Sequence, residues 1–115
     1  MLFSCSGLQA VETTNIQWTE VEGSADVNDG RWHHLAGVYD GKKISLYVDG
    51  KQDASKAAWG NGDKNNYPVY IGENSESLGR PWNGLIDDVR IYSYALSEAE
   101  VKALYEGKEP PRKKE

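Results

Sequence analysis

The stretch DGRWHHLAGVYDGKKISLYVDGK, residues 29–51, decides the fold. Apolar and polar side chains alternate along it, which is the two-residue period of a β-strand. Asp-Gly pairs at 40–41 and 49–50 interrupt the alternation. This dipeptide is the strongest short-range hairpin signal, because both central residues of a type I′ turn need positive φ. The pattern therefore predicts a three-stranded antiparallel meander over residues 31–39, 43–48 and 51–57.

Two adjacent histidines, His33 and His34, lie in the first of these strands. Histidines near carboxylates would suit a metal site or an acid–base pair, but they would equally suit two side chains of one strand. Neighbouring side chains of a strand point to opposite faces of the sheet. The pair therefore cannot chelate one ion while the strand is intact. The spacing favours a structural role for both.

In the second strand of the meander, Ile44, Leu46 and Val48 share one face. Tyr47 and Asp49 lie on the opposite face, where the sequence leaves open whether they meet water or a second layer.

Beyond the meander, further short alternating runs are bounded by glycine, asparagine and proline, which are typical turn residues. They predict additional strands over residues 2–8, 16–21, 68–72 and 82–94, of which the last is the longest. Two polar loops are expected between them, over residues 59–67 and 73–81.

Near the C-terminus the pattern changes to that of a short helix. Ser97 and Glu100 have the spacing of a capping box, in which each side chain bonds the backbone N–H of the other residue. Leu96 and Val101 occupy the positions of a hydrophobic staple around it. Gly107 is expected to end the helix, because glycine adopts the left-handed conformation that follows many helices.

Composition excludes several classes of function. The formal charge is -5 at pH 7, which argues against binding to a phosphate backbone and hence against nucleic acid as a partner. No apolar run is long enough to cross a membrane as a helix, so membrane insertion is not expected. Cys5 is the single cysteine, so no disulfide can form within the chain.

Three segments together resemble a known family: DGRWHHLAGVYDGKKISLYVDGK, then YPVYIGE, then WNGLIDDVRIYSYALSEAEVKALY. They resemble the concanavalin A-like/laminin G-like (LamG) jelly roll, in its bacterial branch, over about residues 30–105. The resemblance implies an all-β antiparallel jelly-roll sandwich with one short C-terminal helix. It also implies that Trp32 is buried and that an imidazole of the histidine pair bonds a nearby loop.

In this family the DGRWHH strand falls near the middle of the domain, whereas here only 28 residues precede Asp29. The resemblance therefore implies that residues 1–107 are the C-terminal half to two-thirds of a jelly roll, incomplete at its N-terminus. Residues 108–115 are expected to be a linker or a disordered tail. The missing N-terminal strands would be supplied by the parent protein or by another chain.

The two loops carry the candidate ligand-binding residues. An indole stacks on the C–H face of a sugar ring, while amide, carboxylate and guanidinium groups bond its hydroxyls. The opposing interpretation is that the loop tryptophan packs against the sheets and that the polar residues only stabilise turns. The candidate set is Trp59, Asn61, Asp63, Asn65, Tyr67 and Arg80.

Asp87 and Asp88 are the candidate metal ligands. Asp87 shares a strand face with Leu85, Val89 and Ile91, where a carboxylate is costly unless a hydrogen-bond donor or a cation compensates it. Carboxylates suit Ca²⁺, and the family resemblance implies a structural calcium at this acidic pair. A purely hydrogen-bonded Asp87 is the alternative. Asp88, on the other face, is expected to be solvated.

The chain lacks the strand with two glutamates flanking an aspartate that glucanases of this fold carry, so an enzyme is not expected. The expected function is non-catalytic binding within a larger extracellular or cell-envelope protein, with a glycan as ligand. The alternatives are an adhesion module that binds a cell-surface or matrix protein, and an accessory domain of a glycoside hydrolase or sulfatase.

Overall fold

The computed structural model describes residues 2–4, 9–13, 18–58, 66, 68–73, 78–79 and 81–109. For residues 2–4, 9–13, 18 and 19 it describes the backbone alone.

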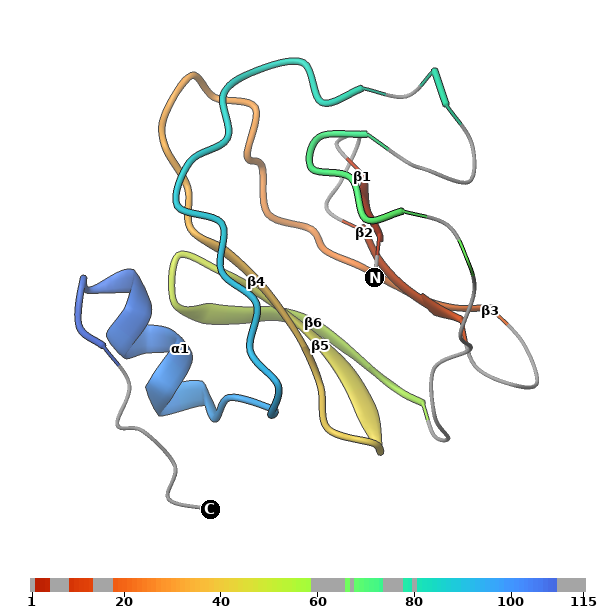
Figure 1. Ribbon diagram of the computed structural model, residues 1–115. Coiled ribbons are helices and arrows are strands. Elements are labelled where there is room, and N and C mark those ends of the chain that lie inside the picture. The colour runs from red at the N-terminus through yellow and green to blue at the C-terminus, as the bar shows by residue number, and fades with distance from the viewer. Residues whose placement is uncertain are drawn as a thin grey trace.

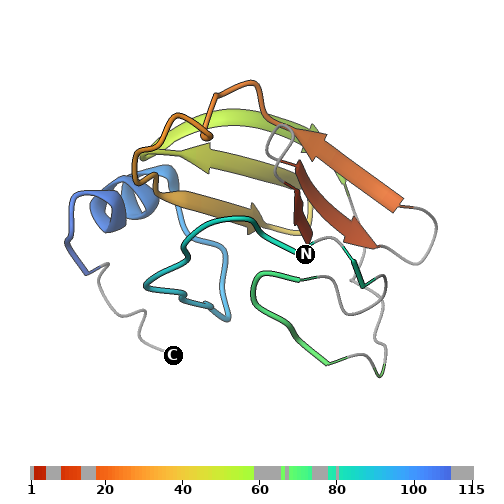
Figure 2. The same ribbon diagram turned by 90° about the horizontal axis from the view of Figure 1, so that it is seen from above.

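The described residues contain two antiparallel sheets of three strands each. The first contains β1 (Leu2–Ser4), β2 (Gln9–Thr13) and β3 (Trp18–Glu22), and the second β4 (Leu35–Tyr39), β5 (Lys43–Val48) and β6 (Lys51–Ala57). In both sheets, neighbours in space are neighbours in sequence. Figures 1 and 2 show that β3 lies beside β6, so the two sheets meet along that side.

The predicted meander is confirmed, with β4 pairing β5 and β5 pairing β6. Asp49 and Gly50, between β5 and β6, have φ of 52° and 80°, as a type I′ turn requires. The turn between β4 and β5 differs, because positive φ is found at Gly41 and not at Asp40. There the Asp40 carboxylate accepts the backbone N–H groups of Lys42 and Lys43, both at 2.9 Å.

The central strand β5 is buried on both faces. Ile44, Leu46 and Val48 pack with Val21 of β3 in one cluster, as their shared face predicts. On the opposite face, Tyr47 packs in a second cluster with Leu96 and Val101 from the helical end of the chain. The structure thereby answers the open question about this face, which meets a second layer at Tyr47.

The helix α1 (Glu98–Tyr105) provides that layer, and Figure 1 shows it against the β4–β6 sheet. Both bonds of the predicted capping box are present. At the other end Gly107 has φ of 80°, its N–H donates to Leu104, and the Lys108 N–H donates to Ala103. These two bonds form a Schellman motif, so both ends of the helix are satisfied.

The polar segment before β4 is fastened to β6 by one carboxylate. Asp53 accepts the backbone N–H groups of Ser24 and Ala25, at 2.9 Å and 3.1 Å, and the Ser24 hydroxyl at 3.2 Å. These bonds fix the start of the segment that leads from β3 to β4.

The N-terminal strand predictions were only partly correct. The described part of the strand predicted over 2–8 is β1, and that of the strand predicted over 16–21 is β3, which continues to Glu22; residues 5–8, 16 and 17 lie outside the described residues. The intervening β2 was not predicted. The described strand β1 pairs with β2, and Leu2 faces Val11.

The strands predicted over 68–72 and 82–94 were wrong, since neither segment contains a strand where the structure describes it. A strand needs a ladder of backbone hydrogen bonds to a neighbour. One backbone bond joins the two segments, from the Trp82 N–H to the Gly72 carbonyl at 2.7 Å. Asp88, with φ of 53°, also interrupts the extended conformation of the second segment.

Candidate functional site

The six candidate ligand-binding residues of the two loops fall outside the part of the chain that the structure describes. They are Trp59, Asn61, Asp63, Asn65, Tyr67 and Arg80. Their predicted role remains a prediction, and the functional geometry below rests on other residues.

The His33 ring contacts two carboxylates that belong to two different turns. Its Nδ1 lies 2.8 Å from Asp49 Oδ2, and its Nε2 lies 2.8 Å from Asp29 Oδ1. Asp29 belongs to the turn before β4, and it also accepts the Arg31 N–H at 3.0 Å. Asp49 is the first residue of the turn between β5 and β6. The imidazole therefore joins the two turns, which confirms that it bonds a nearby loop.

The charges of this cluster support one another. The hydrogen bonds to Asp49 and then to Asp29 raise the pKa of His33 above 6.5. The hydrogen bond from His33, followed by that from the Arg31 N–H, lowers the pKa of Asp29 below 3.8. For Asp49, burial acts to raise the pKa, but bonds from His33 and the His34 backbone outweigh it and the pKa is lowered. An imidazolium between two carboxylates is the favoured state.

His34 has different neighbours. Its backbone N–H donates to Asp49 Oδ1 at 2.9 Å, and its carbonyl accepts the Asp49 N–H at 2.8 Å. Its ring packs near Tyr105 of α1, with 6.1 Å between the ring centroids. The buried Nδ1 has no hydrogen-bond partner, and burial lowers the pKa of this imidazole below 6.5. The two histidine rings therefore make separate contacts, although both residues precede β4 and are not part of the strand predicted for them.

The expectation that Trp32 is buried was wrong, because 66% of its surface is exposed. The strand predicted from residue 31 begins only at Leu35, so Trp32 precedes the sheet and does not reach the core. Its neighbour His33 is nevertheless fixed at both ring nitrogens. The result is an exposed indole on a backbone held in place, which the sequence analysis did not place among the candidate ligand contacts.

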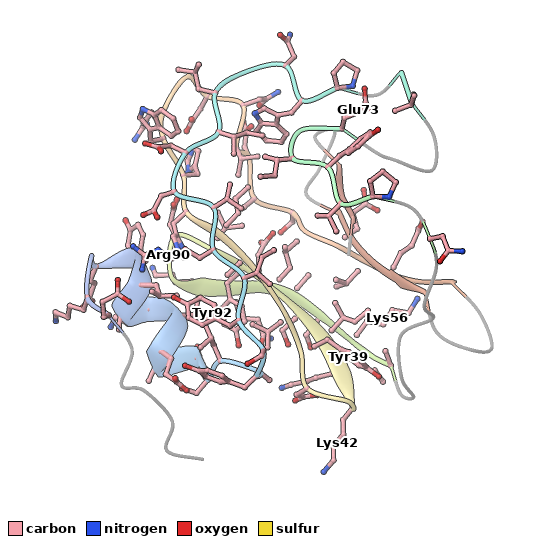
Figure 3. All side chains as sticks on the ribbon, in the orientation of Figure 1. Tyr39, Lys42, Lys56, Glu73, Arg90 and Tyr92 are labelled. Carbon is pink, nitrogen blue, oxygen red and sulfur yellow. The ribbon has the colours of Figure 1, made fainter. Side chains whose placement is uncertain are left out.

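Asp87 and Asp88 are both exposed and lie outside the core. Asp87 Oδ1 accepts the Asp88 N–H at 2.8 Å, so Asp87 is hydrogen-bonded. Asp88 is held by Arg90, whose Nε and Nη2 lie 2.9 Å and 3.3 Å from its two carboxylate oxygens. Arg90 also pairs with Glu109 at 2.7 Å, and Figure 3 shows it beside the C-terminal end of α1. Hydrogen bonds of Arg90 to Asp88, then to Tyr92 and then to Glu109 raise its pKa above the already high ordinary value of arginine.

Exposed apolar side chains gather on the two segments that do not form strands. Figure 2 shows residues 68–73 and 81–92 on the same side of the sheets. Exposed surface of this kind marks an interaction site more often than scattered single residues do. The large exposed apolar residues there are Val69, Tyr70, Ile71, Leu85, Ile86, Val89 and Ile91.

Comparison with known families agrees with this architecture. Residues 6–102 match the family described as the concanavalin A-like lectin/glucanases superfamily. The chain belongs to this superfamily. Its strands in antiparallel sheets and its short C-terminal helix agree with the predicted concanavalin A-like fold, which is confirmed at the level of the superfamily.

A solved structure similar to this superfamily member is the S-layer domain-containing protein of Clostridium thermocellum, residues 221–444. The TM-score is 0.54 at 21% sequence identity, and the match covers 85% of this chain and 51% of that chain. This chain therefore spans about half the length of that structure, and the likeness concerns the fold. No curated protein sequence matches the chain. Among the described residues, no helix is long and apolar enough to span a membrane.

Proposed function

We propose that this chain is a non-catalytic binding module whose ligand is a glycan. The superfamily contains lectins as well as glucanases, as its description states. The observation that carries the proposal is the indole of Trp32, which is exposed while the residue beside it is fixed by two hydrogen bonds. A platform that is already ordered loses little conformational freedom when a ligand binds, and this favours affinity.

The neighbours of Trp32 supply the polar part of sugar recognition. The side chain of Arg31 is 81% exposed and carries several N–H donors. Asp29, on the same turn, offers Oδ2 as an acceptor, since its Oδ1 already accepts from His33 and from the Arg31 N–H. An aromatic face next to donors and acceptors matches a sugar ring, which is apolar on its C–H face and polar at its rim. The loop residues Trp59, Asn61, Asp63, Asn65, Tyr67 and Arg80 are proposed as further contacts.

Trp32→Ala is expected to weaken glycan binding roughly tenfold, because loss of about 1.4 kcal/mol of stacking changes the dissociation constant by that factor. A glycan array followed by calorimetry on the strongest ligand would measure this. Trp32→Phe is the matched control and should keep most of the affinity, since it retains an aromatic face.

Two results would contradict this assignment. If wild-type protein binds no glycan, the lectin function is wrong. If Trp59→Ala abolishes binding while Trp32→Ala leaves it unchanged, the ligand is held by the 59–67 loop and not by Trp32.

A protein ligand is the second candidate, and the exposed apolar side chains of residues 68–73 and 81–92 favour it. In this alternative the module serves adhesion to a cell-surface or matrix protein. The same surface would also suit strands supplied by the parent protein or another chain, which would pair with backbone groups of these segments. A wild-type chain that binds no sugar would shift the assignment to this candidate.

We also propose that calcium binds at the acidic pair, and Asp87 fits the role of a ligand better than Asp88 does. Asp87 keeps Oδ2 available while its Oδ1 accepts a backbone N–H. Asp88 would have to release Arg90 before binding a cation. The described residues contain no group of three acidic, histidine or cysteine side chains placed to hold a metal. The remaining oxygen ligands would therefore come from backbone carbonyls, water or residues beyond the described part.

If calcium binds at Asp87, the melting temperature should rise when Ca²⁺ is added and fall with EDTA. A ligand at one hundred times its dissociation constant stabilises the folded state by about 2.7 kcal/mol. Differential scanning calorimetry of wild type and Asp87→Asn would measure this, and the variant should lose the calcium response. An identical melting temperature of wild type in Ca²⁺ and in EDTA would refute the metal site.

The proposed location is extracellular or at the cell envelope. The similar structure from Clostridium thermocellum is named as an S-layer domain-containing protein, which supports an envelope context for the fold. An accessory role beside a glycoside hydrolase or sulfatase would use the same binding chemistry, with the reaction carried out by another part of the parent protein.

A further inference from the structure

The adjacent histidines occupy environments of opposite electrostatic character. His33 lies between two carboxylates, whereas the His34 ring is packed near Tyr105 with one nitrogen unpaired. We propose that His33 is a pH-dependent fastener that ties the turn at residues 29–33 to the Asp49-Gly50 turn while its ring is protonated and loosens it when the ring loses a proton. This proposal stands whether or not Trp32 binds a glycan.

The geometry requires two protons on the His33 ring. Both of its nitrogens lie 2.8 Å from a carboxylate oxygen, and the two oxygens belong to different residues. A neutral imidazole has one N–H and can donate to only one of them. The other nitrogen would then direct a lone pair at the second carboxylate at the same short distance. Loss of the proton therefore breaks one of the two contacts.

The same arrangement argues against a metal ion at this cluster. Asp29 and Asp49 bond to different nitrogens of the ring, so they approach it from different sides. An ion on one nitrogen would be chelated by one of the carboxylates at most. A proton on each ring nitrogen provides each of the two carboxylates with a hydrogen-bond donor.

Several charged groups from different parts of the chain surround His33 and His34. Asp29 and Arg31 belong to the turn that is fastened, with Arg31 Nε 3.7 Å from the second Asp29 oxygen. Asp49 faces both histidines from the turn between β5 and β6. Asp88 and Arg90 act on His34 with opposite signs, and Tyr105 of α1 covers its ring.

The sign of the His33 contribution follows from its contacts. Hydrogen bonds to Asp49 and then Asp29 raise the pKa of His33 above its ordinary value of 6.5. The stabilisation is complete below pH 6.5 and is lost as pH rises through the folded-state pKa. The pKa values of Asp29 and Asp49 are lowered below 3.8, so their contribution is present above that pH and is lost on further acidification.

His34 acts in the opposite direction. Burial lowers its pKa below 6.5, so the folded state prefers the neutral ring. Its contribution is complete above pH 6.5 and is lost as pH falls from there toward the folded-state pKa. The two histidines should therefore give the pH dependence of stability an acidic and an alkaline limb, and each limb belongs to a different histidine.

Ring NMR signals of the chain, which contains two histidines, test this directly. One ring should titrate above pH 6.5 and the other below, and His33→Gln should remove the first signal. The fastener is refuted if the signal lost in His33→Gln titrates at or below pH 6.5. The titration of both rings can be recorded on the wild-type protein alone. This measurement therefore does not depend on whether His33→Gln folds.

Melting temperatures between pH 5 and pH 8 supply the second readout, with His34→Gln as the matched control. Wild type should lose stability above pH 6.5, and His33→Gln should remove that loss while keeping the acidic limb. His34→Gln should do the reverse. An alkaline limb that persists unchanged in His33→Gln would overturn the proposal, because another group would then cause it.

Discussion

Ile44→Ala is expected to lower the free energy of unfolding by roughly 2–5 kcal/mol, the usual cost of removing a large aliphatic side chain from a core. Ile44 has no exposed surface, and it packs in the cluster that joins β5 to Val21 of β3. The substitution removes its transfer free energy and also leaves a cavity that its neighbours cannot fill completely. Urea denaturation followed by tryptophan fluorescence would measure the change.

Ile91→Ala is the matched control, since it makes the same chemical change at a side chain that is 84% exposed. We expect an effect within about 0.5 kcal/mol, as for most surface substitutions. Equal losses for the two variants would contradict the described core, because they would show that Ile91 is buried in solution. Such a result would also indicate that the apolar surface of residues 81–92 is covered by another segment or copy.

Gly50→Ala is expected to cost roughly 2–5 kcal/mol, for two reasons that add. The φ of 80° at Gly50 disfavours any residue with a Cβ, by about 1–2 kcal/mol. A Cβ there would also lie 2.9 Å from Tyr105 Cδ2, and overpacking of this kind costs typically 1–3 kcal/mol. Denaturant unfolding of the variant would give the sum.

Gly41→Ala separates the two terms. Gly41 has φ of 89°, but no atom lies within 4 Å of the position its Cβ would take. It should therefore show the backbone cost alone. Adding Tyr105→Ala to Gly50→Ala should recover the difference between the two glycine variants. If Gly41→Ala lowers the free energy of unfolding as much as Gly50→Ala does, Tyr105 of the helix does not restrict the space at the Asp49-Gly50 turn.

The features that the sequence predicted best are those that a few neighbouring residues determine. The Asp49-Gly50 turn needs only two residues that tolerate positive φ, and the capping box needs only Ser97 and Glu100 at the correct spacing. Both are present as predicted. Their energies come from contacts within one turn of chain, so no knowledge of the tertiary structure was needed.

The failures concern features that depend on distant partners. The alternation in residues 82–94 is strong, yet a strand also requires a neighbour to supply its backbone bonds, and no neighbour pairs along the described part of this segment. The resemblance to the LamG family implied that Trp32 is buried at the start of a strand, but β4 begins at Leu35 and Trp32 precedes it. Alternation reports which side chains share a face and not whether that face is covered.

The candidate site could be predicted only in part for the same reason. The strand period predicted separate contacts for His33 and His34, and their rings do differ in contacts, but both residues precede β4. That His33 meets Asp29 and Asp49 together depends on two turns approaching each other in the folded chain, which no local pattern encodes. The ligand-binding role of the six loop residues and calcium binding at Asp87 and Asp88 remain predictions for the experiments described above.

The Asp49-Gly50 turn has a consequence for the order of folding. Its own hairpin closes a loop of two residues, whereas its bond to His33 spans 16 residues of chain and its contact with Tyr105 spans more. Loop closure costs more entropy as the enclosed chain lengthens, and contacts between distant residues slow folding. The hairpin of β5 and β6 should therefore form early, as the nucleus onto which the upstream turn and then the C-terminal helix dock.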